Sequence, residues 1–476
     1  SSDVCSSDLS RTNLLKVLKM AEHVIIGNGV AGIKAAETIR KHDPNGKITV
    51  IGDEAYAFYY RPQLPGFVAG KVEEERLWGK KKDFYEKNNI TSHLGKTVIG
   101  IRPDTNEVIL KDDTAINYDS LLIATGGSIK RRSYPGSDLN GGIVQLKTID
   151  DAKNIKERVK SAKSAVVVGE DFLTLSLTEA LHSSGIEVTY LLRGNRLWPE
   201  IMDKDASDIL MLRLKEKGIT IKPDTDIKEV HVKDRLVHGI ITTDDELIDC
   251  QILGIVDKLQ PSIGFLSESG INTDNGILVN NKMLTNFDNI YAAGDVAQLP
   301  ADLDAEIPEI NVRWLKAWKQ GQVAGSNMAG NDAEYDDIAS ISATQICGID
   351  IVSIGASNPL NGDYKIMRGD YPHPETDVYK KLVLKNDKVV GALFVGNAQE
   401  AREITKVIKN KTNYAEIDKK LLKQMFDLDS RFSTFRGFLC PVCKLELPVP
   451  PDAKAGDKIT CPACGIELKV TEGMLK

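Results

Sequence analysis

Two stretches of the chain share one pattern of hydrophobic and polar positions. Residues 21–40 (AEHVIIGNGVAGIKAAETIR) and 163–185 (KSAVVVGEDFLTLSLTEALHSSG) each contain a short apolar run, a turn with glycine, and apolar residues at helical spacing. A second apolar run follows each stretch, at 47–53 and at 186–194. Short apolar runs of this kind fit buried parallel strands, and the spacing between them fits a helix. The pattern predicts two βαβ units, each the core of a doubly wound domain.

The segments around these units complete the predicted organisation. The strand-like segment 276–298 (GILVNNKMLTNFDNIYAAGDVAQ) is expected to return to the first domain, and strands alternate with helices in a later block. We therefore expect an α/β fold with two Rossmann-like domains, an α+β C-terminal domain and a small four-cysteine zinc ribbon. The expected bounds are 21–146 and 273–335 for the first domain, 147–272 for the second, 336–432 for the third and 437–471 for the ribbon.

The start of the chain fits none of these patterns. Its first ten residues, SSDVCSSDLS, match no element that follows. We expect residues 1–20 to be a non-native or disordered leader and leave them out of the fold argument. Met20 directly precedes the first strand pattern and is the expected native start.

Composition narrows the class of protein. The 476 residues are 42% hydrophobic and 27% charged, with a net charge of −7, which is typical of a globular protein with several domains. No basic stripe with interleaved aromatic residues is present, so nucleic acid is not an expected partner. No apolar run approaches the roughly 20 residues that cross a bilayer, so no membrane span is expected.

The turn of the first unit predicts a dinucleotide site. It reads Gly27-Asn28-Gly29-Val30-Ala31-Gly32, a full G-x-G-x-x-G between strand and helix. The first glycine permits the tight turn, the second lets the backbone approach a pyrophosphate, and the third allows close packing of helix and strand. The helix N-terminus directs its amide groups at the phosphates. Asp53 ends the next strand and can accept a hydrogen bond from a ribose hydroxyl, with Glu54 as the neighbouring candidate.

Further segments resemble the pyridine-nucleotide-disulfide oxidoreductase superfamily. NYDSLLIATGG (117–127) is similar to the strand and turn that pass the FAD there, and NIYAAGDVAQ (289–298) to the second FAD signature. AYAFYYRPQLPGFVAG (55–70) resembles the flavin loop of NADH:rubredoxin oxidoreductases and of the FAD module of the nitrite reductase large subunit. The end of the third block resembles the rubredoxin-reductase C-terminal domain. The likeness covers about residues 21–432 and implies an FAD-dependent oxidoreductase.

The same resemblance implies which residues contact the flavin. Asp295 would bind the ribityl chain or its phosphate end, whereas Trp314 is either a flavin contact or part of the core. Many relatives carry Ser-Lys after the Arg-Pro of the flavin loop, but Pro65 and Gly66 stand there, so a flavin-tuning lysine is absent from this position. The implied FAD-binding residues are Gly27, Gly29, Val30, Ala31, Gly32, Asp53, Glu54, Arg61, Val98, Ala124, Thr125, Gly126, Gly294, Asp295 and Trp314.

The second unit departs from a standard nicotinamide-dinucleotide site. Gly169-Glu170-Asp171-Phe172-Leu173-Thr174 keeps only the first glycine, so a side chain and two carboxylates crowd the pyrophosphate position. Leu192 stands where an acid would hold the adenosine ribose, and Lys258 replaces a strand-end glycine. NAD(P)H binding is therefore doubtful. Either the domain has lost it and electrons come from another donor, or Arg193 and Arg196 meet a phosphate in an altered mode.

The isolated cysteines predict no redox-active disulfide. Cys250 lies at a strand end and Cys347 in an apolar run, and we expect both to be buried small hydrophobic residues rather than nucleophiles. No catalytic residue is assigned, because the flavin itself carries the chemistry and must discharge to an external carrier, oxygen or a metal centre.

Four of the remaining five cysteines predict a metal ribbon, and the fifth, Cys5, lies in the expected leader. Two C-x2-C pairs separated by 17 residues have the spacing of a tetrahedral zinc site. The segment resembles the zinc-ribbon amino-group carrier protein of lysine biosynthesis, although the acidic tail of that family is absent here. Zinc is the expected metal, and iron on four thiolates, as in rubredoxin, is the alternative. The predicted ligands are Cys440, Cys443, Cys461 and Cys464.

These features predict a cytoplasmic FAD-dependent oxidoreductase that relays electrons from NAD(P)H or another donor to a small redox protein, for example one like rubredoxin. The net acidity disfavours an acidic carrier unless a local basic patch exists. A second hypothesis is a flavoprotein subunit of a larger electron-transfer complex that does not itself use NAD(P)H. A third is a redox-sensing or carrier scaffold with structural FAD. A homo-oligomer is left open.

Overall fold

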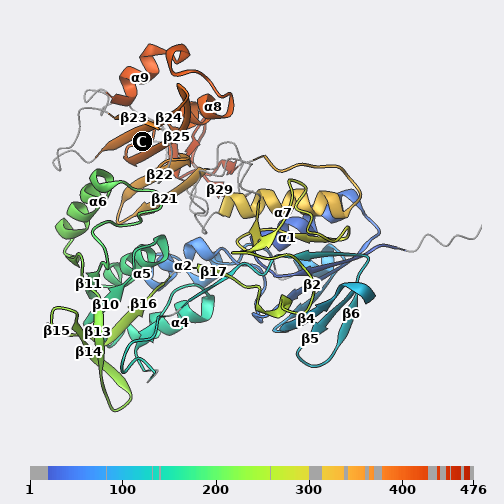
Figure 1. Ribbon diagram of the computed structural model, residues 1–476, viewed down its shortest axis with the longest axis horizontal. Coiled ribbons are helices and arrows are strands. Elements are labelled where there is room, and N and C mark those ends of the chain that lie inside the picture. The colour runs from blue at the N-terminus through green and yellow to red at the C-terminus, as the bar shows by residue number, and fades with distance from the viewer. Residues whose placement is uncertain are drawn as a thin grey trace, which may run out of the picture.

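The computed structural model has three α/β or α+β units and a short C-terminal segment (Figure 1). Within the described part of the chain, no helix is long and apolar enough to cross a membrane. Residues 1–19 of the expected leader lie outside the described residues. The residues that the structure describes are 20–81, 83–130, 132–138, 141–257, 259–299, 314–336, 341–359, 364–368, 378–426, 437–439, 446–450, 452–461 and 466–471.

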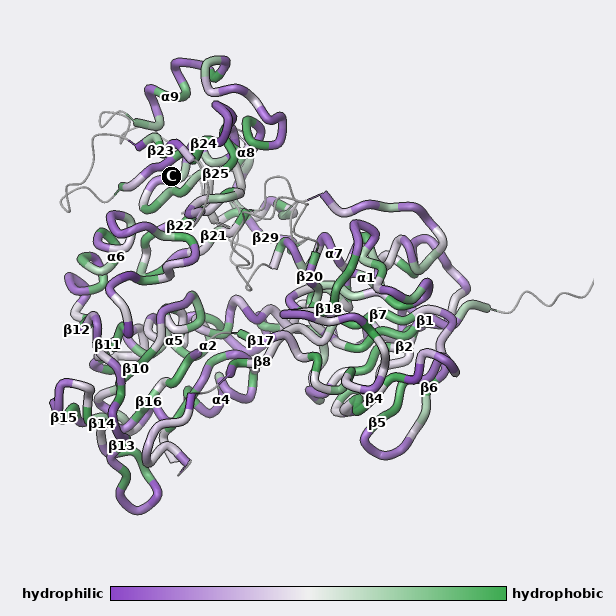
Figure 2. Tube along the Cα trace, in the orientation of Figure 1, coloured by the Kyte–Doolittle hydropathy of each residue, from purple (hydrophilic) through white to green (hydrophobic). Residues whose placement is uncertain are grey.

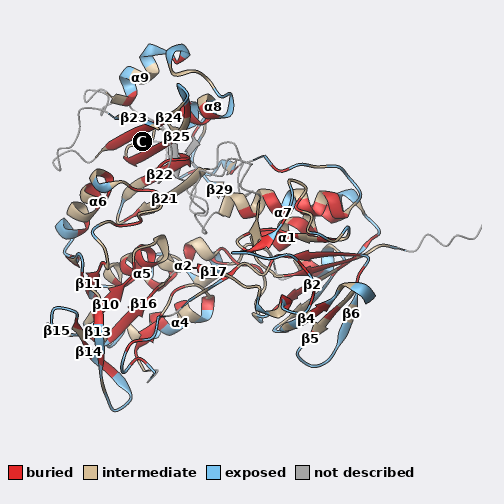
Figure 3. Cartoon of the chain, viewed as in Figure 1, coloured by how far each residue is buried: buried red, intermediate tan, exposed pale blue. Residues whose placement is uncertain are grey.

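The first unit is built on a parallel five-stranded sheet in the order β19-β7-β1-β2-β3. Its central strands are apolar and buried on both faces, as parallel sheets between helices require (Figure 2, Figure 3). The carboxyl ends of parallel strands meet at one edge, which is where such folds bind ligands. The strands are β1 (Glu22–Ile26), β2 (Lys47–Gly52), β3 (Ile90–Leu94), β7 (Ser120–Ile123) and β19 (Ile290–Ala292).

Two helices pack closely on this sheet. They are α1 (Val30–His42) and α7 (Trp314–Met328), which lie side by side in Figure 1 and make many contacts. A Cβ placed on Gly321 would lie 2.2 Å from the Ala31 carbonyl oxygen, and one on Gly325 would lie 2.6 Å from a backbone oxygen one turn further along α1. Only glycine allows helix backbones to approach so closely. This contact brings the start of α7 to the ligand-binding edge of the sheet.

Smaller elements complete the first unit and its junction with the second. An antiparallel sheet β4-β5-β6 flanks it, β18 pairs with β20, and β8 pairs with β17 across the junction. The bounds are α2 (Leu64–Val68), α3 (Phe84–Lys87), β4 (Val98–Arg102), β5 (Glu107–Leu110), β6 (Ala115–Asn117), β8 (Gly127–Ile129), β17 (Leu259–Pro261), β18 (Ile277–Leu278) and β20 (Ala297–Gln298).

The second unit repeats the doubly wound plan. Its parallel sheet has the order β12-β11-β10-β16-β9, and an antiparallel sheet β13-β14-β15 extends from it. The prediction of an α/β fold with Rossmann-type domains is thus confirmed. The bounds are β9 (Ile143–Val144), α4 (Ile149–Arg158), β10 (Ser164–Val168), α5 (Phe172–Ser183), β11 (Glu187–Leu191), α6 (Lys204–Glu216), β12 (Thr220–Lys222), β13 (Ile227–Lys233), β14 (Leu236–Thr242), β15 (Leu247–Asp249) and β16 (Ile252–Ile255).

The third unit is an antiparallel sheet, β21-β22-β25-β24-β23, followed by two helices. It shares a hydrophobic core with the second unit, to which Trp198 and Leu210 contribute from one side and Tyr379 and Leu393 from the other. The bounds are β21 (Ile341–Ile346), β22 (Ile349–Gly355), β23 (Lys365–Arg368), β24 (Tyr379–Lys385), β25 (Lys388–Gly396), α8 (Ala401–Lys409) and α9 (Lys419–Phe426).

A buried polar cluster joins the same two units. Asp203, the N-cap of α6, accepts hydrogen bonds from the Lys381 ammonium and from the Tyr379 hydroxyl, each at 2.6 Å. The Lys381 side chain is fully buried. Asn358 adds a hydrogen bond from its side-chain amide to the Pro199 carbonyl oxygen, at 2.8 Å. A buried ammonium needs its carboxylate partner, so this cluster fixes how the two units meet.

The C-terminal segment forms two short antiparallel pairs, β26 with β27 and β28 with β29. Cys461 is buried in the core of the first unit, and the apolar residues of the second hairpin pack against that core. Among the described residues, no group of three or more potential ligands gathers for a metal ion. Cys440, Cys443 and Cys464 lie outside the described residues, so the zinc ribbon stays a prediction. The bounds are β26 (Gly437–Leu439), β27 (Glu446–Pro448), β28 (Lys458–Thr460) and β29 (Glu467–Lys469).

Asp203→Ala tests the polar cluster between the second and third units. We expect the free energy of unfolding to fall by about 3 kcal/mol, because Lys381 is left buried without its partner. Asp208→Ala on the same helix is the matched control, since it removes an exposed pair with Lys204 and should change stability by less than about 0.5 kcal/mol. Urea unfolding measures both, and equal effects would contradict a stabilising role for the cluster.

Candidate functional site

The first glycine turn connects β1 to α1, and its glycines have different surroundings. Gly27 has a φ of +118°, and a Cβ there would lie 2.1 Å from the Ala124 carbonyl oxygen. A Cβ on Gly32 would lie 1.9 Å from the Gly27 carbonyl oxygen, so this residue sets the close packing of helix and strand. A Cβ on Gly29 would meet no atom within 4 Å. The space beside Gly29 is therefore free for a ligand.

The N-terminus of α1 has no side chain to satisfy its amide groups. Gly29 is the N-cap residue and makes no side-chain hydrogen bond, and the first turn contains no acidic residue. The first amide groups of a helix have no partner within the helix, and its dipole favours an anion. The combination of free space and unpaired amides is what a diphosphate requires.

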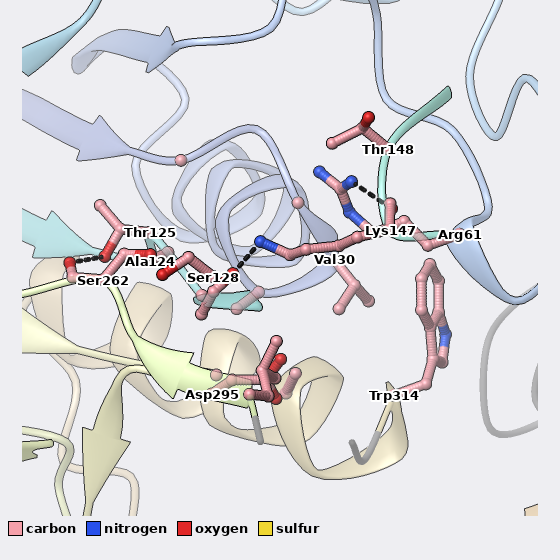
Figure 4. Close-up of a pocket in the computed structure, with 18 of the residues that line it drawn as sticks. Val30, Arg61, Ala124, Thr125, Ser128, Lys147, Thr148, Ser262, Asp295 and Trp314 are labelled. Carbon is pink, nitrogen blue, oxygen red and sulfur yellow. Dashed lines mark hydrogen bonds between the residues drawn. The ribbon is translucent and has the colours of Figure 1, made fainter. Parts of the chain in front are cut away.

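This helix end faces a cavity of about 630 Å³. All three units contribute to its walls, including Phe172 and Trp198 from the second unit and residues 341–344 of β21 from the third. Figure 4 shows Arg61 and Lys147 on one side of this cavity, Asp295 on the other, and Trp314 at one end. The cavity lies at the carboxyl edge of the first sheet, as expected of a doubly wound fold.

The structure gathers the predicted site residues around this cavity, with one exception. Gly32 lies behind the turn, against Gly27, instead of on the cavity wall. The Thr125 hydroxyl donates a hydrogen bond to the Ser262 carbonyl oxygen at 3.0 Å, which ties this wall to the loop after β17. The predicted residues that line the cavity are Gly27, Gly29, Val30, Ala31, Asp53, Glu54, Arg61, Val98, Ala124, Thr125, Gly126, Gly294, Asp295 and Trp314.

The two acidic candidates after β2 differ in their availability. Glu54 is engaged within the protein, because one of its oxygens accepts from Arg61 and the other from the Tyr59 hydroxyl at 2.6 Å. Asp53 is exposed at the cavity and accepts the Glu54 backbone N–H at 3.0 Å. Asp53 is therefore the better placed acceptor for a ribose, and Glu54 serves to position Arg61.

Lys147 is a cavity residue that sequence reasoning missed. Its ammonium donates a hydrogen bond to the Gly127 carbonyl oxygen, and its own carbonyl oxygen accepts from Arg61 at 3.0 Å. Burial lowers the pKa of Lys147, and Arg61 lowers it further, while Asp295 and Asp53 act in the opposite direction. In the sequence, Lys147 lies between a buried strand and Thr148, whose capping box starts α4. The first and second units meet at this place, and that position is the only sequence feature that could have indicated Lys147.

Asp295 faces Lys147 across the cavity. Burial raises the pKa of Asp295 to about 6, against the lowering effects of Lys147, Lys316 and Arg61. The opposing charges therefore only partly offset the removal of this carboxyl group from water. A carboxylate with two acceptor oxygens at this place suits hydroxyl groups of a bound ligand.

Trp314 belongs to an aromatic cluster and also lines the cavity. Its ring packs on Phe58 and Tyr60, with ring centroids 5.8 Å and 5.7 Å apart. The same residue lines the cavity, and its indole N–H is buried without a hydrogen-bond partner among the described residues. A buried donor without a partner is uncommon, and a ligand acceptor in the cavity would satisfy it.

The second glycine turn, between β10 and α5, does not resemble the first. Asp171 is the N-cap of α5, and its side chain accepts the Thr174 backbone N–H. Arg193, one of the two arginines predicted to meet a phosphate, is instead paired with Asp257 at 3.3 Å and with Asp226 at 3.5 Å. The altered binding mode with Arg193 and Arg196 stays a prediction, and it would require a phosphate to compete with Asp226 and Asp257 for Arg193.

Asp295→Asn is expected to change the pH dependence of stability in the FAD-free protein. The pKa of about 6 in the folded protein exceeds the ordinary value of 3.8, so the folded state holds a proton that the unfolded chain releases. This contribution is complete below the ordinary pKa and is lost as the pH rises from about 4 to about 6. Thermal midpoints should show wild type losing stability relative to the variant across this range, and parallel curves would contradict the expectation.

Comparisons with known proteins agree with this geometry. The family model described as pyridine nucleotide-disulphide oxidoreductase matches residues 21–322. The model described as rubredoxin NAD+ reductase C-terminal domain matches residues 344–412. The two matches cover the first and second units and most of the third.

Individual relatives point the same way. The chain is 29% identical to NADH-rubredoxin oxidoreductase of Clostridium acetobutylicum over 401 residues, which are 84% of this chain and 97% of that protein. It is 31% identical to rhodocoxin reductase of Rhodococcus erythropolis over 316 residues, which are 66% and 74% of the two proteins. The crystal structure of NADH:rubredoxin oxidoreductase from Clostridium acetobutylicum superposes with a TM-score of 0.70 at 28% identity, covering 85% of this chain and 99% of that one.

Proposed function

Because the chain belongs to the pyridine nucleotide-disulphide oxidoreductase family, we propose that it is an FAD-dependent oxidoreductase that relays electrons to a small redox protein. The main support is the N-terminus of α1, where unpaired amide groups and the free space at Gly29 face the cavity. A diphosphate satisfies those amides, and the cavity of about 630 Å³ is in the size range of cofactor sites.

Each wall of the cavity has a part in this proposal. The turn at residues 27–31 holds the diphosphate, Asp53 the ribose of the adenosine, and Asp295 the ribityl hydroxyls. Lys147 and Arg61 supply positive charge beside the cofactor. The other proposed contacts are Val98, Ala124, Thr125, Gly126, Gly294 and Trp314, with Glu54 acting through Arg61.

Bound FAD supplies the redox chemistry, since a flavin takes up an electron pair and releases electrons singly. The chain binds and orients it and excludes water. Cys250 and Cys347 do not extend this relay, because burial raises the pKa of each thiol to about 12 and keeps it protonated at neutral pH. Electrons therefore leave the flavin for an acceptor other than these two cysteines.

The names of the relatives indicate the class of acceptor. One relative is named for rubredoxin and another for rhodocoxin. By this analogy, the acceptor of the present chain is a small protein with an iron centre. A contact between two proteins suffices for such a relay, because electron-transfer encounters bury little surface.

Gly29→Asp tests the cofactor site, because it gives the first turn the residue type that Asp171 provides in the second. We expect FAD binding to weaken at least about a hundredfold, since like charges at a phosphate site cost several kcal/mol. The flavin absorbance of the purified protein measures bound FAD.

A second experiment tests the proposed acceptor. Wild-type protein is reduced anaerobically with dithionite and freed of excess reductant. It should then reduce oxidised rubredoxin, and the visible absorbance of rubredoxin measures this reduction.

Gly100→Asp is the matched control. A Cβ at Gly100 also meets no atom within 4 Å, but this residue does not line the cavity. It should retain FAD. A correctly folded wild type that is colourless and cannot be reconstituted with FAD would contradict the proposed function, and so would a reduced flavoprotein that fails to reduce rubredoxin and other small iron proteins.

A second candidate is a flavoprotein subunit of a larger electron-transfer complex. The observation that favours it is the carboxylate of Asp171 at the N-terminus of α5, where a nicotinamide dinucleotide would need free amide groups. Such a subunit would receive its electrons from a neighbouring subunit. Isolation from native cells as a stable complex, with no NAD(P)H oxidation by the chain alone, would favour this candidate.

We also propose that the C-terminal segment is a zinc ribbon held by Cys440, Cys443, Cys461 and Cys464. The support is the C-x2-C spacing of both pairs and the two antiparallel hairpins beside them. By itself a segment this short has a small core, and a bound metal would add to its stability. Four thiolates also require a reducing compartment, which supports a cytoplasmic location. Iron is the alternative metal.

Metal analysis of the purified chain tests this ribbon. We expect one zinc per chain, no visible charge-transfer bands, and loss of the metal in Cys461→Ser, because a hydroxyl is a poor zinc ligand. Cys250→Ser is the control, since Cys250 is buried in the second unit, and it should keep the metal. Iron with visible bands would select the rubredoxin-like alternative, and a metal-free folded chain would refute the ribbon.

A further inference from the structure

The N-terminus of α5 already carries an anion that belongs to the chain. Oδ1 of Asp171 accepts hydrogen bonds from the Thr174 backbone N–H and from the Thr174 hydroxyl, both at 2.9 Å. In a Rossmann unit that binds a dinucleotide, a pyrophosphate takes these amide groups. We propose that the second unit is closed to NAD(P)H by its own side chains, and that Asp171 is the residue that determines this specificity.

The turn keeps the backbone shape of a dinucleotide turn. Gly169 has a φ of +152°, and a Cβ there would lie 2.5 Å from the Val256 carbonyl oxygen. β10 pairs in parallel with β11 and with β16, as β1 pairs with its neighbours in the first unit. The closure therefore comes from the side chains on the turn, because the backbone needed to hold a pyrophosphate is present.

Helix α1 provides the comparison within the same chain. Both N-cap residues follow the first glycine of their turn by two positions, Gly29 in α1 and Asp171 in α5. Gly29 leaves free space and makes no cap hydrogen bond, whereas Asp171 fills the position and engages the amide of Thr174. A phosphate entering the second turn would meet a carboxylate on the amides it needs, and the like charges would repel.

A second carboxylate lies where the nucleoside would bind. Glu170 Oε1 would be 3.5 Å from a Cβ on Gly194, so this carboxylate lies beside the chain that follows β11. In this fold the end of that strand receives the adenosine ribose. Leu192 at this place is fully buried and offers no side-chain acceptor. The backbone N–H of Trp198 donates to the Glu170 carbonyl oxygen at 2.7 Å, which holds the following loop against the turn.

Two arginines of this region, Arg193 and Arg132, are paired with carboxylates inside the protein. Arg193 pairs with Asp226 and Asp257, and Arg132 pairs with the same two carboxylates at 3.3 Å and 3.7 Å. The Arg193 side chain is only 14% exposed. A dinucleotide phosphate would have to displace these carboxylates before Arg193 could bind it, and that exchange leaves Asp226 and Asp257 with Arg132 as their remaining arginine partner.

Two aromatic rings complete the closure. Phe172 and Trp198 have ring centroids 5.2 Å apart and a tilt of 35°. Both residues line the cavity proposed for FAD, and Phe172 is the first residue of α5, directly after Asp171. The second unit therefore contributes a packed pair of aromatic rings to the cavity wall.

The second unit retains a structural role under this inference. Its core continues into the third unit, and the Asp203 cluster fixes that junction. The inference rests on the proposed function, because it concerns how the flavin of that function receives electrons. It implies that a reduced protein donor, and not NAD(P)H held by this unit, supplies the two electrons that reduce the flavin.

Anaerobic titration of the FAD-loaded full chain tests the closure. With NADH or NADPH up to about 1 mM, the upper end of ordinary KM values, the flavin absorbance of wild type should not bleach within minutes. NAD+ and NADP+ should leave the thermal midpoint unchanged, since only a ligand that binds the folded state raises it. Asp171→Gly should show both bleaching and a raised midpoint, with apparent affinity improved at least about tenfold. Glycine is itself a favourable N-cap, so this variant is expected to fold.

Asp244→Gly is the matched control, because it makes the same change of charge at an exposed turn of the same unit. It should behave as wild type. Rapid bleaching of the wild-type flavin at micromolar NADH or NADPH would overturn the inference, and so would a raised wild-type thermal midpoint with NAD+ or NADP+. The inference also fails if Asp171→Gly binds these nucleotides no better than wild type, or if Asp244→Gly gains as much affinity as Asp171→Gly. Dithionite separates failure of the proposed function from failure of this inference. A flavin that dithionite cannot reduce refutes the proposed function, and the thermal midpoint with NAD+ or NADP+ still tests whether the second unit is closed.

Discussion

The backbone amide groups at the start of a Rossmann helix need acceptors, and this requirement organises the whole chain. At α1 the protein supplies no acceptor, because Gly29 has no side chain and the first turn has no acid. The free space there faces a cavity that all three units line. The amide groups at the start of α1 therefore need an external anion, and the proposed FAD diphosphate would be that anion.

The second unit meets the same requirement in the opposite way. Asp171 provides an internal acceptor for the amides of α5, and Asp226 and Asp257 provide internal partners for Arg193. Each of these charged groups therefore has a partner within the protein. One backbone plan thus occurs twice in a single chain with different helix caps, Gly29 in the first unit and Asp171 in the second.

The junctions between units decide what surrounds the cavity. The core shared by the second and third units, together with Asp203 and Lys381, holds those units in one arrangement. That arrangement presents Phe172 and β21 to the cavity of the first unit. The environment of the proposed flavin therefore depends on contacts that lie far from it, because they orient the walls contributed by two other units.

Local rules allowed the sequence to determine the βαβ repeat and the differing turns at Gly29 and Asp171, since turn geometry and helix capping depend on a few adjacent residues. The sequence did not reveal that Lys147 enters the cavity or that Arg193 is already paired. Each of these facts depends on contacts between residues that the fold brings together. Only the tertiary structure decides them, because burial and charge pairing are properties of the packed molecule.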